Sequence, residues 1–241
     1  MKKFLFFVCA AVISLGAAEV DFRNYRLEKI GKREESIIWH TYYSYNARDK
    51  QSPRVLLVGD SVCRGYHDQV RNILAKKVNV TYWATSNCIT DPLYLQMLEL
   101  VLAREKFDII IFNNGLHSLA TDRAAWRKAF SLAMDYLGKR VPETKVVVLN
   151  STPKKDDDPR VKEINQLTEA VAAEKSLILA DIYSFCAGWN KKEWRDLYHF
   201  NNKAKKMQAK FVSDVILKHI GRTADNLVQQ SSETGPDGKL K

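Results

Sequence analysis

The sequence is poor in the residues that mark several protein classes. Of its 241 residues only 10 are glycine and 6 are proline, which is too few for a collagen-like or a disordered chain. We find no internal repeat and no low-complexity domain. Hydrophobic residues make up 46% and charged residues 27% of the chain, so one complete globular core is expected at this length.

The sequence also lacks a hydrophobic run long enough to cross a membrane. Its longest apolar run, Phe4 to Leu15, falls short of the roughly 20 residues that span a bilayer. Lys2 and Lys3 precede this run and Gly16-Ala17-Ala18 follows it, which is the arrangement of a cleaved secretory signal. We therefore expect a signal peptide over residues 1–18, a secreted or periplasmic protein, and no stable membrane insertion.

Cysteine is scarce, and no two cysteines form a CxxC pair. The chain has 4 cysteines, and those after the signal are Cys63, Cys88 and Cys186, too far apart in sequence for a typical structural zinc site. The acidic run from Asp156 to Asp158 lacks the further ligands that a metal ion needs, so we expect a solvated loop there. Neither a metal nor an organic cofactor is predicted.

Positive charge is in excess but is not concentrated. The formal net charge is +10, yet basic residues are mixed with acidic ones along the predicted helices. The densest basic group, on one predicted helix, consists of Lys203, Lys205, Lys206 and Lys210. No nucleic-acid-binding motif accompanies it, so we interpret it as a solvated face and expect no nucleic-acid partner.

From residue 54 onward, short runs rich in Val and Ile alternate with amphipathic stretches. This pattern is typical of βα units and predicts a five-stranded parallel sheet covered on both faces, a three-layer α/β domain. The predicted strands are Arg54 to Gly59, Val78 to Ala84, Phe107 to Phe112, Lys145 to Asn150 and Leu177 to Ile182. The predicted helices are Gly65 to Lys76, Pro92 to Arg104, Thr121 to Arg140, Pro159 to Glu174 and Asn201 to His219.

The segments outside this pattern have a different character. Residues 19–53 include an aromatic stretch from Trp39 to Tyr45, which we interpret as an added strand or as a cover over one sheet edge. Residues 54–220 form the predicted catalytic domain. Residues 221–241 are polar and contain Gly, Ser and Thr, so we expect a flexible tail.

Gly59-Asp60-Ser61 follows the first predicted strand and leads into a helix. Helix N-terminal amides and the helix dipole favour developing negative charge at such a place. Ser61 is therefore a candidate nucleophile. The alternative is that Asp60 and Ser61 are only turn and capping residues.

Asp196-Leu197-Tyr198-His199 precedes the last predicted helix. A serine nucleophile needs a base to take its proton, and the base needs a partner that fixes its tautomer. His199 and Asp196 supply these two groups if their turn packs against Ser61. Alone, the same residues are typical of a helix cap and a surface histidine.

Together, in this order and at either end of an α/β pattern, the two motifs resemble those of the SGNH (GDSL-type) hydrolases. The resemblance covers roughly Arg54 to His219 and implies a flavodoxin-like three-layer sandwich. It further implies that Ser61 is the nucleophile, His199 the base and Asp196 its orienting acid. The α/β-hydrolase elbow GxSxG is not matched, because Cys63 stands where its second glycine belongs.

The middle blocks of the chain depart from the family pattern. The family has a glycine after strand two, which is absent here, and G-x-N-D after strand three, where this chain is similar to a divergent branch with N-x-G-L-H. We expect residues of these two loops to bind the oxyanion or the substrate, because the loops lie at the strand ends where such donors are needed; the alternative is that Asn113 to Ser118 only form a turn. The candidates are Asn87, Asn113, Asn114, Gly115 and His117.

In the resembling fold strands one and two are neighbours, so their following loops emerge at the same sheet edge. We therefore expect Cys63 and Cys88 to form a disulfide beside the active site and Cys186 to stay free. Two separate buried thiols are the alternative.

The resemblance and the export signal together favour a serine esterase that removes small acyl groups. The expected substrate is a small ester or an O-acetylated glycan. Lipid esters and thioesters are alternatives within the same chemistry. A non-catalytic carbohydrate-binding or envelope protein on the same fold is the alternative from another class, motivated by the altered middle blocks. The sequence leaves the oligomeric state open.

Overall fold

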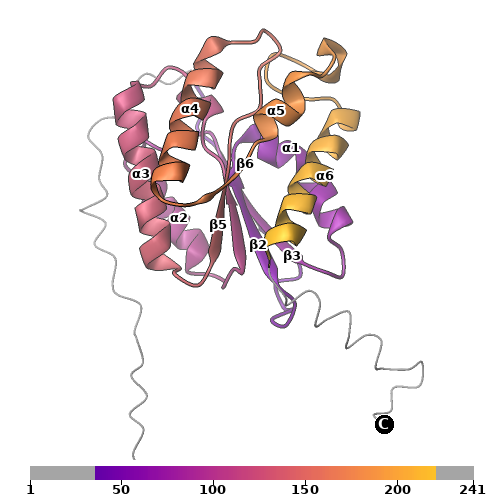
Figure 1. The fold of residues 1–241 in the computed structure, drawn as a ribbon. Coiled ribbons are helices and arrows are strands. Elements are labelled where there is room, and N and C mark those ends of the chain that lie inside the picture. Colours follow the sequence, from indigo (N-terminus) through magenta and orange to yellow (C-terminus); the bar gives the residue numbers. More distant parts are fainter. Residues whose placement is uncertain (1–35, 221–241) are drawn as a thin grey trace, which may run out of the picture.

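The computed structural model describes residues 36–220. The predicted signal peptide, the first part of the 19–53 segment and the predicted tail lie outside the described residues. The chain forms one six-stranded sheet in the order β1-β3-β2-β4-β5-β6, with helices on both faces (Figure 1). The strands are β1 (His40–Ser44), β2 (Arg54–Gly59), β3 (Asn79–Thr85), β4 (Ile109–Phe112), β5 (Lys145–Leu149) and β6 (Ile178–Ala180).

Five of these strands are parallel, and the sixth is an addition to the expected sheet. β2 pairs in parallel with both β3 and β4, and β5 and β6 continue the sheet in the same sense. β1 pairs antiparallel with β3, with His40 opposite Thr85 and Ser44 opposite Thr81. The aromatic segment is thus an added edge strand, one of the two interpretations that the sequence allowed. The three-layer α/β fold class is confirmed.

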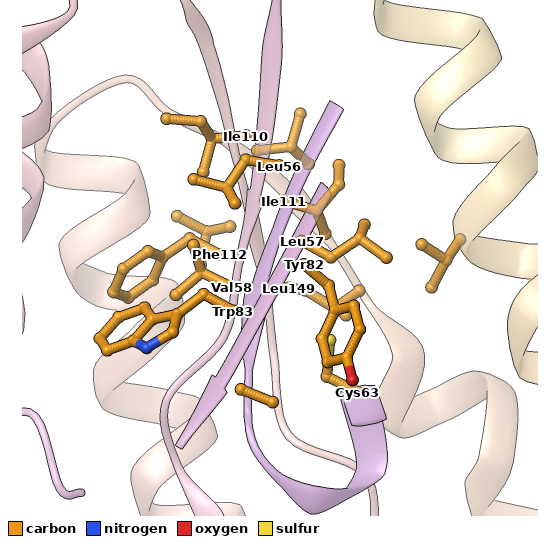
Figure 2. Packing of buried hydrophobic residues seen from close by; sticks show 14 of the residues in the cluster. Leu56, Leu57, Val58, Cys63, Tyr82, Trp83, Ile110, Ile111, Phe112 and Leu149 are labelled. Carbon is orange, nitrogen blue, oxygen red and sulfur yellow. The ribbon is translucent and has the colours of Figure 1, made fainter. Parts of the chain in front are cut away.

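The central strands are buried on both faces, which explains their uninterrupted apolar sequences. Every residue of β2 and β4 is buried. Because side chains alternate along a strand, Val58, Trp83 and Phe112 point to one side of the sheet, and Leu57 and Tyr82 point to the other (Figure 2). The two helical layers pack onto these two apolar surfaces.

Helices α1 and α6 cover one face of the sheet, and α2, α3 and α4 cover the other (Figure 1). Their bounds are α1 (Ser61–Ile73), α2 (Tyr94–Leu102), α3 (Arg123–Arg140), α4 (Pro159–Glu174), α5 (Ile182–Ala187) and α6 (Asn202–His219). Among the described residues, the 3-10 helices η2 (Leu116–Ser118) and η3 (Lys191–Glu193) interrupt the loops. The short elements α5, η2 and η3 were not predicted. No helix within residues 36–220 is long and apolar enough to span a bilayer.

Aspartate and asparagine side chains fix where several of these helices begin. Asp60, Asp122, Asp158 and Asn201 each accept a hydrogen bond from a backbone amide in the first turn of the helix that follows. Such a cap is worth about 1 kcal/mol. α1 consequently starts at Ser61, four residues before the predicted Gly65. The carboxyl ends of β2, β3, β4 and β5 lie at one edge of the sheet, and the loops that follow them carry the polar residues discussed next.

Candidate active site

Ser61 is placed by the sharp connection between β2 and α1. Asp60 caps the helix, because its Oδ1 accepts hydrogen bonds from the amides of Val62 at 2.8 Å and Cys63 at 3.4 Å. Gly59 is required here, since a Cβ atom at that position would lie 2.5 Å from Cys63 Cβ. Ser61 is therefore the first residue of a 13-residue helix, where the helix dipole favours negative charge.

His199 is placed by a closed turn that joins η3 to α6. Trp194 and Phe200 form an antiparallel bridge at the base of the turn, and their rings pack with centroids 4.8 Å apart. Both side chains are buried, and Trp194 Nε1 donates to the Pro153 carbonyl at 3.3 Å. The amide of Arg195 donates to the His199 carbonyl at 2.7 Å. The aromatic residues before His199 thus support the turn by packing.

The turn brings His199 against Ser61 across 138 residues of sequence. His199 Nε2 lies 2.8 Å from Ser61 Oγ. On the other side of the ring, Nδ1 lies 2.9 Å from both carboxylate oxygens of Asp196. Serine, imidazole and carboxylate therefore form one hydrogen-bonded line, the arrangement needed to activate a serine hydroxyl.

The carboxylate of Asp196 is held in its ionised form. Burial alone would raise the pKa of Asp196, but hydrogen bonds from the amides of His199 and Tyr198 and from the His199 ring outweigh it and lower the pKa well below its usual value. The two amide bonds to Asp196 Oδ1 measure 2.8 Å and 2.9 Å. A fixed negative charge of this kind stabilises an imidazolium ring on His199.

Two predicted oxyanion residues, Asn87 and Asn114, join the loops after β3 and β4. Asn114 Nδ2 donates to the Asn87 carbonyl at 3.0 Å, and Asn114 Oδ1 accepts from the Ile89 amide at 3.0 Å. Asn87 Nδ2 donates to Asp91 Oδ2 at 2.6 Å. The Nδ2 atom of an asparagine carries two hydrogens. In Asn87 and in Asn114 these contacts use one of the two.

The other three predicted residues of this group have different surroundings. Asn113 Nδ2 donates to the Leu149 carbonyl at 2.8 Å and to Ser151 Oγ at 3.3 Å, which uses both of its N–H bonds within the fold. Gly115 lies against Ser151, so that any side chain at Gly115 would collide with it. His117 is half-buried, and its ring stands edge-on to Trp39 with centroids 6.1 Å apart.

The predicted Cys63–Cys88 disulfide is wrong. Cys63, Cys88 and Cys186 are all free and buried. Cys63 faces the same side of the sheet as Tyr82 (Figure 2), whereas Cys88 Sγ lies 3.1 Å from Ser118 Oγ and 3.5 Å from Thr121 Oγ1, near the start of α3. The two loops share an edge, but the thiols point to opposite faces.

The acidic loop before α4 is also more ordered than expected. The side chains of Lys154 and Asp158 are only 4% and 7% exposed and pair at 2.7 Å. Lys154 Nζ also lies 4.8 Å from the centre of the Tyr198 ring, so this loop supports the turn that carries His199. Within residues 36–220, no group of three or more His, Cys, Asp or Glu side chains is arranged to bind a metal ion.

Sequence reasoning missed two residues near the candidate nucleophile Ser61, namely Trp39 and Arg64. Arg64 lies one helical turn after Ser61, and its guanidinium carbon is 4.2 Å from the centre of the Trp39 ring. The spacing of three residues between Ser61 and Arg64 was the only signal in the sequence, and it places both residues on one side of a helix. Trp39 could not be predicted here, because it is brought to the site by the pairing of β1 with β3.

Comparison with known proteins gives a consistent structural result. No protein-family model and no curated protein matches the sequence. A protein from Slackia heliotrinireducens assigned to the SGNH hydrolases matches with 18% identity and a TM-score of 0.55, covering 68% of this chain and 99% of that chain.

Two further solved structures have similar scores. A lipase/acylhydrolase from Enterococcus faecalis has 20% identity and a TM-score of 0.57, covering 68% of this chain and 95% of its own. A carbohydrate esterase family 3 protein from Talaromyces cellulolyticus has 17% identity and a TM-score of 0.59, covering 70% of this chain and 98% of its own. At these identities the likeness concerns the fold.

Proposed function

We propose, starting from the SGNH hydrolase fold that this chain has, that it is a serine esterase acting on small acyl esters. The observation that carries the proposal is the line from Ser61 Oγ through the His199 ring to the Asp196 carboxylate, with contacts of 2.8 Å and 2.9 Å. The lipase, acylhydrolase and carbohydrate esterase named above support ester hydrolysis as the reaction type.

In the proposed reaction, Ser61 Oγ attacks the ester carbonyl while His199 Nε2 takes the hydroxyl proton. The tetrahedral intermediate collapses, the ester C–O bond breaks, and the alcohol leaves with that proton. A water molecule then attacks the acyl-serine and gives a proton to His199; the bond between Ser61 Oγ and the acyl carbon breaks, the carboxylic acid leaves, and His199 returns the proton to Ser61 Oγ. Asp196 remains ionised throughout and stabilises the imidazolium.

The oxyanion formed in each step lies at the start of α1, where the helix dipole favours negative charge. The loops after β3 and β4 supply the further donors in this proposal. Asn87 and Asn114 are better suited than Asn113, because Asn113 donates both N–H bonds to Leu149 and Ser151. The imidazole ring of His117, in the loop after β4, is the other candidate donor to the oxyanion in this proposal.

We further propose that the substrate is an O-acetylated carbohydrate and that the enzyme acts outside the cytoplasm. The predicted secretory signal supports the location, and the likeness to a carbohydrate esterase supports the substrate class. A lipid ester and a thioester are the competing substrates. The competing function is that of a carbohydrate-binding protein without activity. It is motivated by the absence of the glycine that SGNH hydrolases have after their second strand, which is β3 in this chain.

The deciding experiment measures hydrolysis of p-nitrophenyl acetate by the mature chain. We expect the Ser61→Ala variant to lose about 10³-fold or more in kcat without a change in thermal stability. Ser131→Ala is the control, because Ser131 lies in α3 on the other face of the sheet and should leave the rate unchanged. A folded wild-type protein that hydrolyses no short ester would favour the binding protein.

A further inference from the structure

The edge strand places Trp39 at the rim of the candidate active site. The Trp39 amide donates to Ser86 Oγ at 2.9 Å, and the Trp39 carbonyl accepts from the Ser86 amide at 3.0 Å and from Thr85 Oγ1 at 3.1 Å. These bonds fix Trp39 beside the carboxyl end of β3, the edge at which Ser61 lies. The Trp39 ring thereby bridges the start of α1 and the His117 loop.

The guanidinium group of Arg64 lies on this ring. Its side chain is exposed, and no carboxylate within residues 36–220 forms an ion pair with it. The contact with Trp39 restricts the guanidinium through a cation–π interaction. A positive group is thus held one helical turn from the nucleophile.

A second arginine on the same helix, Arg71, forms an ion pair and provides a comparison for Arg64. Arg71 lies two turns further from Ser61, and its guanidinium carbon is 4.6 Å from the centre of the Tyr45 ring. Unlike Arg64, it pairs with a carboxylate, because its Nε lies 3.4 Å from Asp68 Oδ1. The two arginines share a helix and an aromatic contact and differ in ion pairing and in distance from Ser61.

A lysine adds to the positive charge on this side of the nucleophile. Lys205 of α6 packs against Gly65, since a Cβ atom at Gly65 would lie 3.3 Å from Lys205 Cε. The carboxylate next to Ser61, that of Asp60, is buried and caps α1. The surface beside the nucleophile therefore offers cations to a ligand, and such a surface attracts negatively charged substrates.

We propose that Arg64 is a specificity-determining residue that binds a carboxylate on the sugar part of the ester. The substrate class is then an O-acetylated sugar acid rather than an O-acetylated neutral sugar. The planar guanidinium group suits a carboxylate, with which it forms two parallel hydrogen bonds. This inference rests on the proposed esterase function.

The test uses two substrates that differ in one charge. A mono-O-acetylated methyl glucuronoside is supplied as the free acid and as its methyl ester, and acetate release is followed for both. We expect the wild type to have a kcat/KM about 5- to 10-fold higher for the acid, an effect between that of an exposed ion pair and that of a hydrogen bond to a charged group. Added salt should reduce this preference.

Three variants locate the preference. Arg64→Gln should bring the ratio of the two kcat/KM values to about one, mainly through a higher KM for the acid, while hydrolysis of the neutral ester stays within about twofold. Arg64→Lys should retain part of the preference, because the charge remains but the planar geometry is lost. Arg71→Gln, the matched control, should behave like the wild type.

The outcomes separate this inference from the esterase proposal. A wild type that hydrolyses both substrates equally, or an Arg64→Gln variant that keeps the preference, overturns the role of Arg64 and leaves the esterase standing. An equal loss on both substrates in Arg64→Gln would make Arg64 structural and overturn the inference too. If neither substrate nor p-nitrophenyl acetate is hydrolysed, the esterase proposal fails and this inference fails with it.

Discussion

Asp196 has two tasks in the turn before α6, and one substitution separates them. It accepts the amides of Tyr198 and His199, which shapes the turn, and it accepts a hydrogen bond from His199 Nδ1. In Asp196→Asn the side-chain oxygen can still accept the amides, but the negative charge that fixes the tautomer is lost. We expect kcat to fall by about 10²- to 10⁴-fold with little change in thermal stability.

The measurement is steady-state hydrolysis of p-nitrophenyl acetate beside a thermal melt. Asp214→Asn is the control, since Asp214 is an exposed aspartate of α6 that pairs with Lys210. If Asp196→Asn kept more than about a tenth of the wild-type kcat, the carboxylate would have no part in orienting His199.

The sequence identified Ser61, Asp196 and His199 as candidates because their motifs are local. Asp60 shapes the turn that positions Ser61, and Asp196 shapes the turn that positions His199. Each motif therefore contains both a functional residue and the residue that fixes its local geometry. The surroundings of these motifs were less predictable. The sequence predicts Asn113 as an oxyanion donor, but its side-chain amide donates to the Leu149 carbonyl and to Ser151 Oγ. The sequence could not predict these contacts, because they exist only after the sheet has formed.

The start of α4 depends on a charged cap that is sensitive to acid. Hydrogen bonds from Arg160 and from Lys154 hold the pKa of Asp158 well below its usual range, against the effect of burial. A carboxyl group whose pKa is lowered on folding stabilises the protein above its unfolded-state value of about 3.9, and that contribution is lost as the pH falls below it.

We therefore expect Asp158→Asn to lower the free energy of unfolding by about 2 kcal/mol near neutral pH, because it leaves Lys154 buried without its closest carboxylate. Asparagine also caps helices, so the change tests the charge. The difference from the wild type, measured by urea unfolding, should shrink below about pH 4. Asp156→Asn, at a more exposed partner 3.5 Å from Lys154, should cost well under 1 kcal/mol. A difference independent of pH would contradict the prediction.

Elements with a strong local pattern were predicted closely, and those formed by distant pairing were not. β2 and α4 have the predicted bounds, since an apolar run and a Pro after a capping Asp mark them. β1 was only one of two interpretations, because its place beside β3 depends on pairing across about 40 residues and not on its own alternation. β6 is shorter than the predicted strand Leu177 to Ile182 and has only three residues. The six-residue α5 begins at Ile182 and was not predicted, because such short elements carry little sequence pattern.

The absence of a disulfide in the described part of the molecule predicts how its thiols react. Burial raises the pKa of Cys186 to about 12 and that of Cys63 further above its ordinary value. Since the thiolate is the reactive form and all three thiols are buried away from the reagent, we expect iodoacetamide to label none of Cys63, Cys88 and Cys186 in the native protein near pH 8. After unfolding without a reductant, mass spectrometry of the mature chain should show all three labelled. A pair that resists labelling until it is reduced would contradict the structure.

The direction of the edge strand also decides how the molecule can be attached to a support. β1 enters the sheet at the rim of the candidate active site, where His40 lies opposite Thr85. α6 begins beside His199 and runs 18 residues, about 27 Å, toward the other edge. The described chain therefore begins near the candidate active site and ends far from it (Figure 1). Immobilisation through residues after Ile220 should leave the candidate active site accessible to bulky polymers, whereas coupling just before Trp39 would obstruct it.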